Sequence, residues 1–277
     1  MSDRVTITIL VDNHAKSGLV AEHGLSFWIE ADGKKIIFDT GGSPAWHHNA
    51  KTLGIDGDAA DILVLSHGHC DHTGGIPAIL RNGHTPHVFA HPGVVVPRYS
   101  LRDATANAIH MPRESMRALD KVEPEQMHWV YGPVPLTEKI RLTGPVPRKT
   151  DFEDTGGPFY LDPHGKRPDF IEDDLSLWVE TDRGLILCTG CCHAGLVNTI
   201  HAVQRLNPGV PILAVIGGLH LVTAGINRLN QTVDALRKSH VQRLIPLHCT
   251  GDMAIDFLID RLGNKITPGM AGQTYGF

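Results

Sequence analysis

The sequence predicts an α/β fold in which two mixed β-sheets pack face to face and helices cover the outside. Three observations support this prediction. The chain divides into two halves, and each half begins with hairpin-like strand patterns. In each half, later strands alternate with helices. No linker separates the halves, and 277 residues with 42% hydrophobic content can bury a large core in one domain.

The elements of the first half follow from the spacing of apolar residues. Val5, Ile7, Ile9 and Val11 alternate, which predicts a half-buried strand. Residues 25–42 predict two strands around a turn at residues 31–33, followed by a glycine loop. The further predicted elements are a helix at 45–54, a buried strand at 62–65, a helix at 75–82 and a strand at 87–92.

Residues 93–170 differ from the rest, because they hold most of the prolines and show weak periodicity. We expect a partly helical insertion, with short strands near residues 128–136 and 139–144. Residues 151–170 predict a long loop. In a compact enzyme such a loop is often a lid or a substrate-binding element. The alternative is a variable surface excursion.

The second half returns to clear patterns. The predicted elements are a hairpin of strands 175–181 and 185–190, a helix at 194–206, a strand at 211–218, a helix at 226–239, a strand at 243–248 and a helix at 253–262. We expect the end of the chain to be irregular.

Charge and composition argue against several functional classes. The net charge is −5 and no basic run stands out, so the pattern of nucleic-acid binding is missing. There is no apolar run of about 18 residues, the length that crosses a membrane. The N-terminus lacks the features of a signal peptide, and five cysteines argue against a disulfide framework. We expect a cytoplasmic protein without nucleic-acid or membrane partners.

Four buried-looking strands each run into a histidine: His67, His193, His220 and His248. Loops at strand ends carry polar groups whose positions the strands hold in place, and ligands gather there in α/β folds. Four such histidines predict convergence on one site.

The strongest motif is SHGHCDHTGG at residues 66–75, which holds His67, His69, Asp71 and His72. On an extended turn, His67 and His69 point the same way and can grip one metal ion. Asp71 and His72 then lie at the start of the next helix, where their side chains can bind a second metal ion. Histidine nitrogen and carboxylate oxygen suit zinc and similar divalent ions.

This motif resembles the signature of the metallo-β-lactamase superfamily, His-x-His-x-Asp-His after a hydrophobic strand. The preceding IIFDTGG, residues 36–42, is similar to that superfamily as well. The resemblance covers nearly the whole chain. It implies an αββα sandwich, with residues 1–277 as a single domain and a lid or substrate-binding insertion at about 93–170.

Further segments resemble one subgroup, the dihydropterin-ribofuranosylaminobenzene-phosphate synthase-like proteins, many of which are called metal-dependent hydrolases. These segments are AEHGLSFWIE, TGCCHAGLVNTI, GGLHL and PLHCTG. The resemblance implies a hydrolase in which metal-activated water attacks a small ester, lactone or phosphoester. It also implies one or two divalent metal ions, with zinc favoured and iron, manganese or magnesium left open. Homo-oligomerisation is left open too.

Three other functions remain alternatives. One is a transferase that joins a dihydropterin diphosphate to an aminobenzene ribofuranosyl phosphate. Another is a mononuclear iron persulfide oxygenase, although diiron redox relatives typically have glutamate where this chain has His69. The third is a metal-binding module without catalysis.

The chain departs from the superfamily pattern in its second half. Asp174 stands where a histidine ligand is expected, and Cys191 stands where a bridging aspartate is expected. His193 is the natural substitute ligand, and His248 matches the final histidine. Cys191 is either a direct thiolate ligand or stands behind His193, while the adjacent Cys192 is expected to face the core.

Other residues receive supporting roles. Asp71 can orient or deprotonate the attacking water, and His220 is a candidate general acid or substrate contact. Asp39 is expected to orient a histidine ligand. Asp174 is either a ligand or a carboxylate that fixes a loop, and His91 either lines the pocket or is structural.

Overall fold

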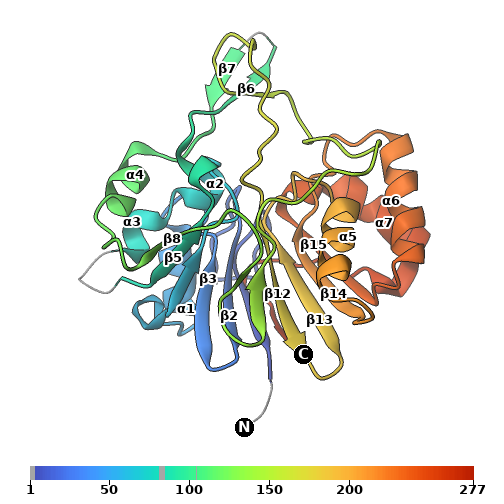
Figure 1. The fold of residues 1–277 in the computed structure, drawn as a ribbon, viewed down its shortest axis with the longest axis horizontal. Coiled ribbons are helices and arrows are strands. Elements are labelled where there is room, and N and C mark those ends of the chain that lie inside the picture. The colour runs from blue at the N-terminus through green and yellow to red at the C-terminus, as the bar shows by residue number, and fades with distance from the viewer. Residues whose placement is uncertain (1–3, 81–84, 104) are drawn as a thin grey trace.

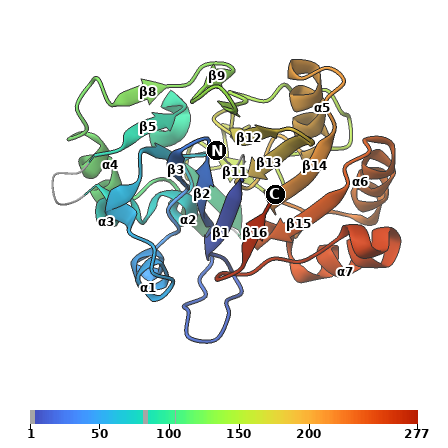
Figure 2. The ribbon, with the colours of Figure 1, turned by 90° about the horizontal axis from the view of Figure 1, so that it is seen from below.

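The computed structural model describes residues 4–80, 85–103 and 105–277. In Figure 1, strands form two layers in the centre and helices lie on the two outer sides. The helices are, in chain order, α1 (Ala45–Thr52), α2 (Cys70–Thr73), α3 (Ile76–Ile79), α4 (Arg113–Leu119), α5 (Leu196–Leu206), α6 (Ile226–Lys238) and α7 (Asp252–Leu262). Figure 2 shows α1, α3 and α4 outside one sheet and α5, α6 and α7 outside the other. This is the αββα sandwich that the sequence predicts.

The first sheet contains both antiparallel and parallel pairs. Its strands, in spatial order, are β16 (Thr274–Gly276), β1 (Thr6–Val11), β2 (Ser26–Ala31), β3 (Lys34–Phe38), β4 (Ile62–Val64), β5 (His87–Ala90) and β8 (Met127–Trp129). β1, β2 and β3 pair antiparallel, whereas β3, β4, β5 and β8 run parallel. The loops that follow β3, β4 and β5 therefore leave from one edge of the sheet.

The second sheet repeats this plan. Its strands, in spatial order, are β15 (Arg243–Leu247), β14 (Ile212–Gly218), β13 (Gly184–Thr189), β12 (Ser176–Thr181), β10 (Ile140–Leu142) and β9 (Val134–Pro135). β12 and β13 form the predicted hairpin, and β13, β14 and β15 run parallel. The loops after these three strands again leave from one edge.

Alternation along the strands builds three apolar layers. Phe27 and Ile29 of β2 pack between the two sheets, against residues such as Leu177 and Ile186 of the second sheet. Trp28, between them in the chain, faces the opposite way and packs with the helices outside the first sheet. Because side chains alternate faces with a period of two, strands buried on both sides must be apolar throughout.

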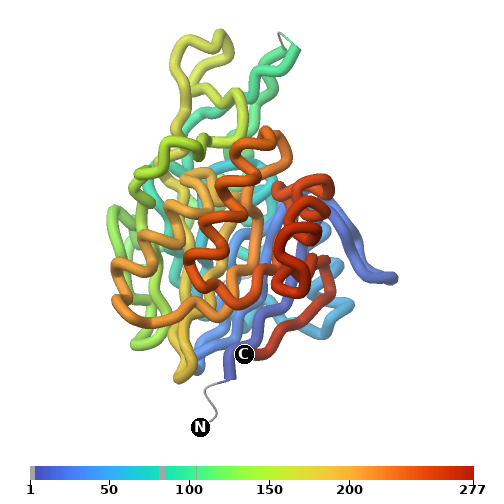
Figure 3. Tube along the Cα trace, turned by 90° about the vertical axis from the view of Figure 1, so that its right-hand side faces the viewer, coloured from blue at the N-terminus to red at the C-terminus, as the bar shows by residue number. Residues whose placement is uncertain are grey.

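A smaller third sheet projects beyond the end of the sandwich. It consists of β11 (Phe159–Tyr160), β6 (Tyr99–Arg102) and β7 (Thr105–Ala108). Figure 1 shows the β6–β7 hairpin at the top of the molecule, and Figure 3 shows it beside a second projecting segment. We call residues 99–103 and 105–108 together with 159–160 the flap.

The short strands expected near residues 128–136 and 139–144 are present as β8, β9 and β10, which pair within the two main sheets. Two other sequence predictions differ from the structure. The irregular C-terminus was wrong, because β16 pairs antiparallel with β1. The helix predicted at 75–82 ends at Ile79 as α3, and residues 81 and 82 lie outside the described residues. The three residues of β16 are too few to show periodicity, so only the pairing with β1 reveals this strand.

Among the described residues, no helix is both long enough and apolar enough to cross a membrane.

Candidate metal centre

Histidines from four loops meet where the parallel strands of both sheets end. His67 follows β4, His193 follows β13, His220 follows β14 and His248 follows β15. The rings of His67 and His193, which come from different sheets, have centroids 4.8 Å apart. The ring centroids of His193 and His220 are 4.3 Å apart. The strand-end histidines therefore converge, as expected from the sequence.

His67, His69 and His193 form a first group of candidate metal ligands. One donor atom from each lies within 4.8 Å of the others. The Nε2 atom of each ring is buried and has no hydrogen-bond partner among the described residues. Buried polar atoms without partners are rare, so three that converge fit a divalent cation.

The surroundings keep these rings neutral and aimed at one another. Burial lowers the pKa of His67, His69 and His193 well below its usual range, so each ring keeps a lone pair at neutral pH. The Nδ1–H of His67 donates to Ser66 Oγ at 2.9 Å. The Nδ1–H of His193 donates to the Thr155 carbonyl at 2.8 Å. With Nδ1 occupied in these two rings, Nε2 is the atom left for a metal.

Asp71, His72 and His248 form a second group beside the first. Nε2 of His248 lies 3.3 Å from Asp71 Oδ2 and 3.3 Å from Nε2 of His72. Burial opposes ionisation of Asp71, but the neighbouring His72 and His248 outweigh it and hold the pKa of the carboxyl well below its usual range. A carboxylate with two imidazoles can hold a second divalent ion.

Hydrogen bonds behind the second group orient its histidines. The Nδ1–H of His72 donates to Asp39 Oδ2 at 2.7 Å, and the Nδ1–H of His248 donates to Asn13 Oδ1 at 2.8 Å. Burial opposes protonation of His72, but Asp39 and Asp71 outweigh it and raise the pKa of His72 to about 9. A carboxylate behind an imidazole also makes it a stronger ligand. Asp39 thus orients a histidine, as expected, whereas the contact of Asn13 with His248 was not predicted.

The sulfur of Cys191 lies between the two groups. Its Sγ is 3.1 Å from Nε2 of His72. It also forms clusters within 4.8 Å with His67 and His72, and with His193 and His220. Burial raises the pKa of the thiol, which a nearby dication would oppose.

Cys249 was given no role from the sequence, yet its sulfur lies in this centre. One donor atom each from Cys191, His248 and Cys249 lie within 4.8 Å of one another. The sequence feature that could have identified Cys249 is its position directly after His248, a histidine at a strand end. Cys188 and Cys192 instead pack in the apolar layers, and the sequence predicted this position for Cys192.

His220 and a covering loop close the centre on one side. The Nδ1 atom of His220 is buried and has no partner among the described residues. A Cβ atom placed on Gly156 would lie 1.8 Å from His220 Cδ2, and Gly156 has φ of +85°. Only glycine therefore allows the loop to approach the ring so closely.

The same loop carries Phe159, which sequence reasoning did not single out. Its ring centroid lies 5.3 Å from that of His69, 5.4 Å from that of His193 and 5.8 Å from that of His220. The ring thus covers the first group with an apolar surface.

A pocket of about 620 Å³ opens onto the centre. Asp71, His220 and His248 line it together with residues of the flap. His23, another residue that sequence reasoning missed, also lines it, and its Nε2 lies 3.3 Å from Asp71 Oδ2. A ligand in this pocket would therefore reach the second group directly.

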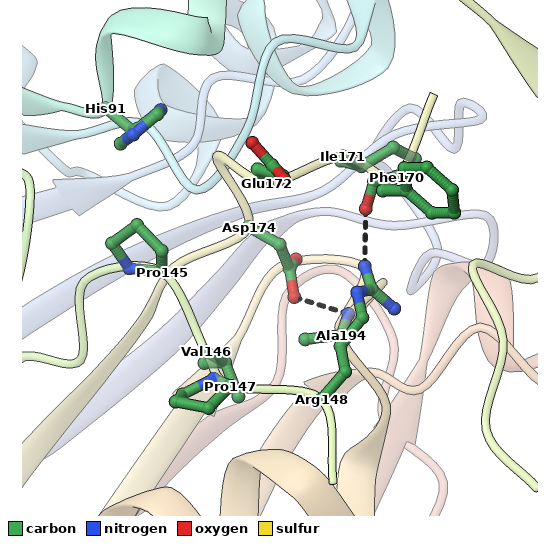
Figure 4. A pocket seen from close by; sticks show the side chains of 10 residues that line it. All are labelled: His91, Pro145, Val146, Pro147, Arg148, Phe170, Ile171, Glu172, Asp174 and Ala194. Atoms are coloured by element: carbon green, nitrogen blue, oxygen red, sulfur yellow. Dashed lines mark hydrogen bonds between the residues drawn. The ribbon is translucent and has the colours of Figure 1, made fainter. Parts of the chain in front are cut away.

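Asp174 and His91 lie elsewhere. Both line a separate pocket of about 370 Å³, shown in Figure 4. Asp174 Oδ2 accepts a hydrogen bond from the backbone N–H of Ala194 at 2.8 Å, and Asp174 belongs to none of the donor clusters of the described residues. His91 Nδ1 accepts from the N–H of Gly93. Asp174 fixes the loop that carries His193, and His91 caps its own turn.

The backbone beside the centre is strained. Asp39, Cys192, His220 and His248 have φ values of 59°, 60°, 44° and 49°. Left-handed conformations of non-glycine residues cost about 1–3 kcal/mol each and gather at functional sites. Strain of this kind after four different strands is consistent with a site built for ligand binding.

Comparisons with known proteins agree with this geometry. A family model described as the metallo-β-lactamase superfamily matches residues 19–190. The chain is 31% identical over 292 residues to the 7,8-dihydropterin-6-methyl-4-(β-D-ribofuranosyl)-aminobenzene-5′-phosphate synthase of Methanocaldococcus jannaschii, covering 99% of this chain and 97% of that one. It is also 32% identical to an uncharacterised protein of that organism, over 98% of this chain and 99% of that one.

A solved structure is similar over nearly the same length. It is described as Tm1679, a metal-dependent hydrolase of the β-lactamase superfamily, with a TM-score of 0.83 and 27% sequence identity. The similarity covers 98% of each chain.

Proposed function

Because the chain belongs to the metallo-β-lactamase superfamily, and within it resembles the dihydropterin-related synthase, we propose that it is a metal-dependent hydrolase of a small ester, lactone or phosphoester. The superfamily is enzymatic and the full-length relative is a named synthase, so the protein is an enzyme. The type of reaction and the identity of the metal are what we propose.

One observation carries it: the Nε2 atoms of His67, His69 and His193, which are buried and have no hydrogen-bond partner in the described part of the chain, converge beside a pocket. Asp71, His72 and His248 supply a second group of donors next to them. Nitrogen and sulfur donors with one carboxylate favour zinc or iron over magnesium. A pair of zinc ions fits this donor set best.

When bound, the metal ions would lower the pKa of water toward neutrality and polarise a carbonyl or phosphoryl oxygen. Asp71 borders the pocket and is ionised, so it can accept a proton from the attacking water. His220 borders the same pocket, and its Nδ1 has no hydrogen-bond partner among the described residues, so it can donate a proton to a leaving group or hold the substrate.

Metal content and hydrolysis should depend on the same residues. The zinc-loaded protein is expected to hydrolyse at least one of a panel of aryl esters, lactones and phosphodiesters. His69→Ala and His193→Ala should each reduce bound metal and lower kcat/KM by at least about 100-fold. The exposed helical residue His201 provides the matched control, since His201→Ala should change neither. Metal and activity that both survive the two ligand variants would overturn the proposal.

The second candidate is the transferase that joins a dihydropterin diphosphate to an aminobenzene ribofuranosyl phosphate. It is favoured by the 31% identity to the synthase over nearly the whole of both chains. The test incubates the protein with a dihydropterin methyl diphosphate and the aminobenzene acceptor. Formation of the coupled product, without ester hydrolysis, would favour the transferase. A mononuclear iron oxygenase gains no support, because it needs only one of the two donor groups.

A further inference from the structure

The inner side of the flap presents a row of side chains to the pocket above the metal centre. Phe159 of β11 pairs with Ser100 of β6, which pairs with Asn107 of β7. Residues opposite each other in a sheet point to the same side, and Arg102 follows Ser100 by two residues on that side. All four side chains line the pocket of about 620 Å³. The flap therefore adds a hydroxyl, an amide and a guanidinium to a pocket whose floor is the candidate metal centre.

Two of these groups lack partners among the residues that the structure describes. The Ser100 side chain is buried, at 7% exposure, and its Oγ has no hydrogen-bond partner among the described residues. Arg102 is exposed, and its guanidinium has no carboxylate partner in the described part of the chain. A buried hydroxyl without a partner destabilises the folded protein, because it has lost its hydrogen bonds to water. Its retention beside an unpaired guanidinium suggests that a ligand supplies the missing contacts.

The base of the flap is held in place, so this row has a defined position. Arg98, just before β6, donates to Asp169 at 2.8 Å and to Asp173 at 2.8 Å. Asp173 also accepts from the N–H of Gly68, between the candidate ligands His67 and His69. The flap is thereby tied to the loop that carries the metal-binding motif.

We propose that the pocket side of the flap, formed by Ser100, Arg102 and Asn107, binds an anionic group of the substrate that is remote from the bond that reacts. The group is a phosphate or a carboxylate, because guanidinium pairs with both through two parallel hydrogen bonds. Phe159 supplies an apolar face for the ring or chain that connects this group to the reacting bond. The inference rests on the proposed function, in which that bond lies at the metal centre.

Binding measurements on the zinc-loaded protein test the subsite without requiring turnover. The probes are a phenyl riboside, its 5-phosphate and its 5-carboxylate, titrated by calorimetry. The wild-type protein should bind one of the charged forms about tenfold more tightly than the neutral form. Arg102→Ala should remove that preference, and Arg102→Lys should keep part of it. Whichever charged form loses affinity identifies the anion.

Two further variants separate recognition from folding. Arg117→Ala, an exposed arginine on α4, should leave the preference unchanged. Ser100→Ala should weaken binding of the charged probe by a few-fold without lowering the melting temperature, since it removes a buried hydroxyl that has no partner among the described residues.

The proposal is overturned if the charged probes bind no better than the neutral one. It is also overturned if their preference survives Arg102→Ala, because the metal ions would then hold the anion. Hydrolysis is not measured here, so failure of the subsite is distinguishable from failure of the proposed reaction.

Discussion

At the scale of single residues, Cys191 takes the central place in the candidate site. The superfamily pattern leads one to expect a bridging aspartate there, and the structure has a sulfur near donors of both groups. Sulfur is a softer donor than oxygen, so the exchange shifts metal preference toward zinc and iron. The neighbouring Cys192 faces the core because its backbone adopts φ of 60° and turns it away.

A thiolate ligand at Cys191 has a spectroscopic signature. The cobalt-substituted protein should show thiolate-to-metal absorption in the near ultraviolet, and Cys191→Ser should abolish most of it. Cys70→Ser is the control, because Cys70 lines the pocket without joining a donor cluster of the described residues. Unchanged absorption in Cys191→Ser would mean that Cys191 stands behind His193.

The buried carboxylate of Asp174 lowers the free energy of unfolding when it is charged. Burial raises its pKa to about 6 from 3.8. The folded protein therefore holds this proton more tightly than the unfolded chain. The charged form opposes folding by up to about 3 kcal/mol above pH 6, and this cost disappears as the pH falls toward 4.

Asp174→Asn should consequently stabilise the metal-free protein at pH 8 and have little effect near pH 4. The free energy of unfolding, measured by urea denaturation across this range, checks the sign. A variant less stable than wild type at pH 8 would mean that the carboxylate has a favourable partner.

At the scale of elements, the loop 150–157 connects the flap to helix α5 and to the candidate metal centre. Glu153 accepts hydrogen bonds from the N–H groups of Val197 and Asn198, at 2.8 Å and 2.9 Å. These N–H groups lie in the first turn of α5, where a carboxylate satisfies open donors and complements the helix dipole. Two residues later, the carbonyl of Thr155 orients His193.

Glu153→Gln should therefore affect both stability and metal binding. We expect a loss of about 1–2 kcal/mol in unfolding free energy and about tenfold weaker zinc binding through the loosened His193. The exposed neighbour Asp151 supplies the comparison, since Asp151→Asn should change neither quantity. Competition with a chromophoric chelator measures the affinity. Normal zinc affinity in a destabilised Glu153→Gln would show that the loop only caps the helix.

At the scale of the whole molecule, a buried ion-pair network joins the halves of the chain. Arg98 precedes the flap, and Asp169 and Asp173 precede the second-half hairpin. The side chains are at most 5% exposed, and Asp173 also holds the N–H of Gly68. One network thus ties the two sheets, the flap and the metal-binding loop together.

Asp173→Asn should lower the unfolding free energy by about 3–5 kcal/mol, because it leaves a buried arginine with one partner fewer. Asp234→Asn, which breaks the exposed pair with Arg237 on α6, should cost less than about 1 kcal/mol. Thermal and urea denaturation compare the two variants. Equal, small effects would show that the network does not couple the halves.

The predictable parts of this protein are those with a local signal. The longer strands and helices follow from periodicity, and the helix over 226–239 matches α6 to within a residue. The motif of His67, His69, Asp71 and His72 follows from spacing alone. The flap and β16 could not be predicted, because their strands consist of four residues or fewer and depend on partners that are distant in the chain.

The sequence by itself determined the sandwich, the strand-end histidines and the departures at Asp174 and Cys191. Only the tertiary structure decided which donors meet. It grouped His193 with His67 and His69, put the sulfur of Cys249 beside Cys191, and left Asp174 holding the backbone of Ala194. The physical reason is that ligand groups are set by distances between loops of different strands. Those distances depend on how two sheets pack, which no local pattern encodes.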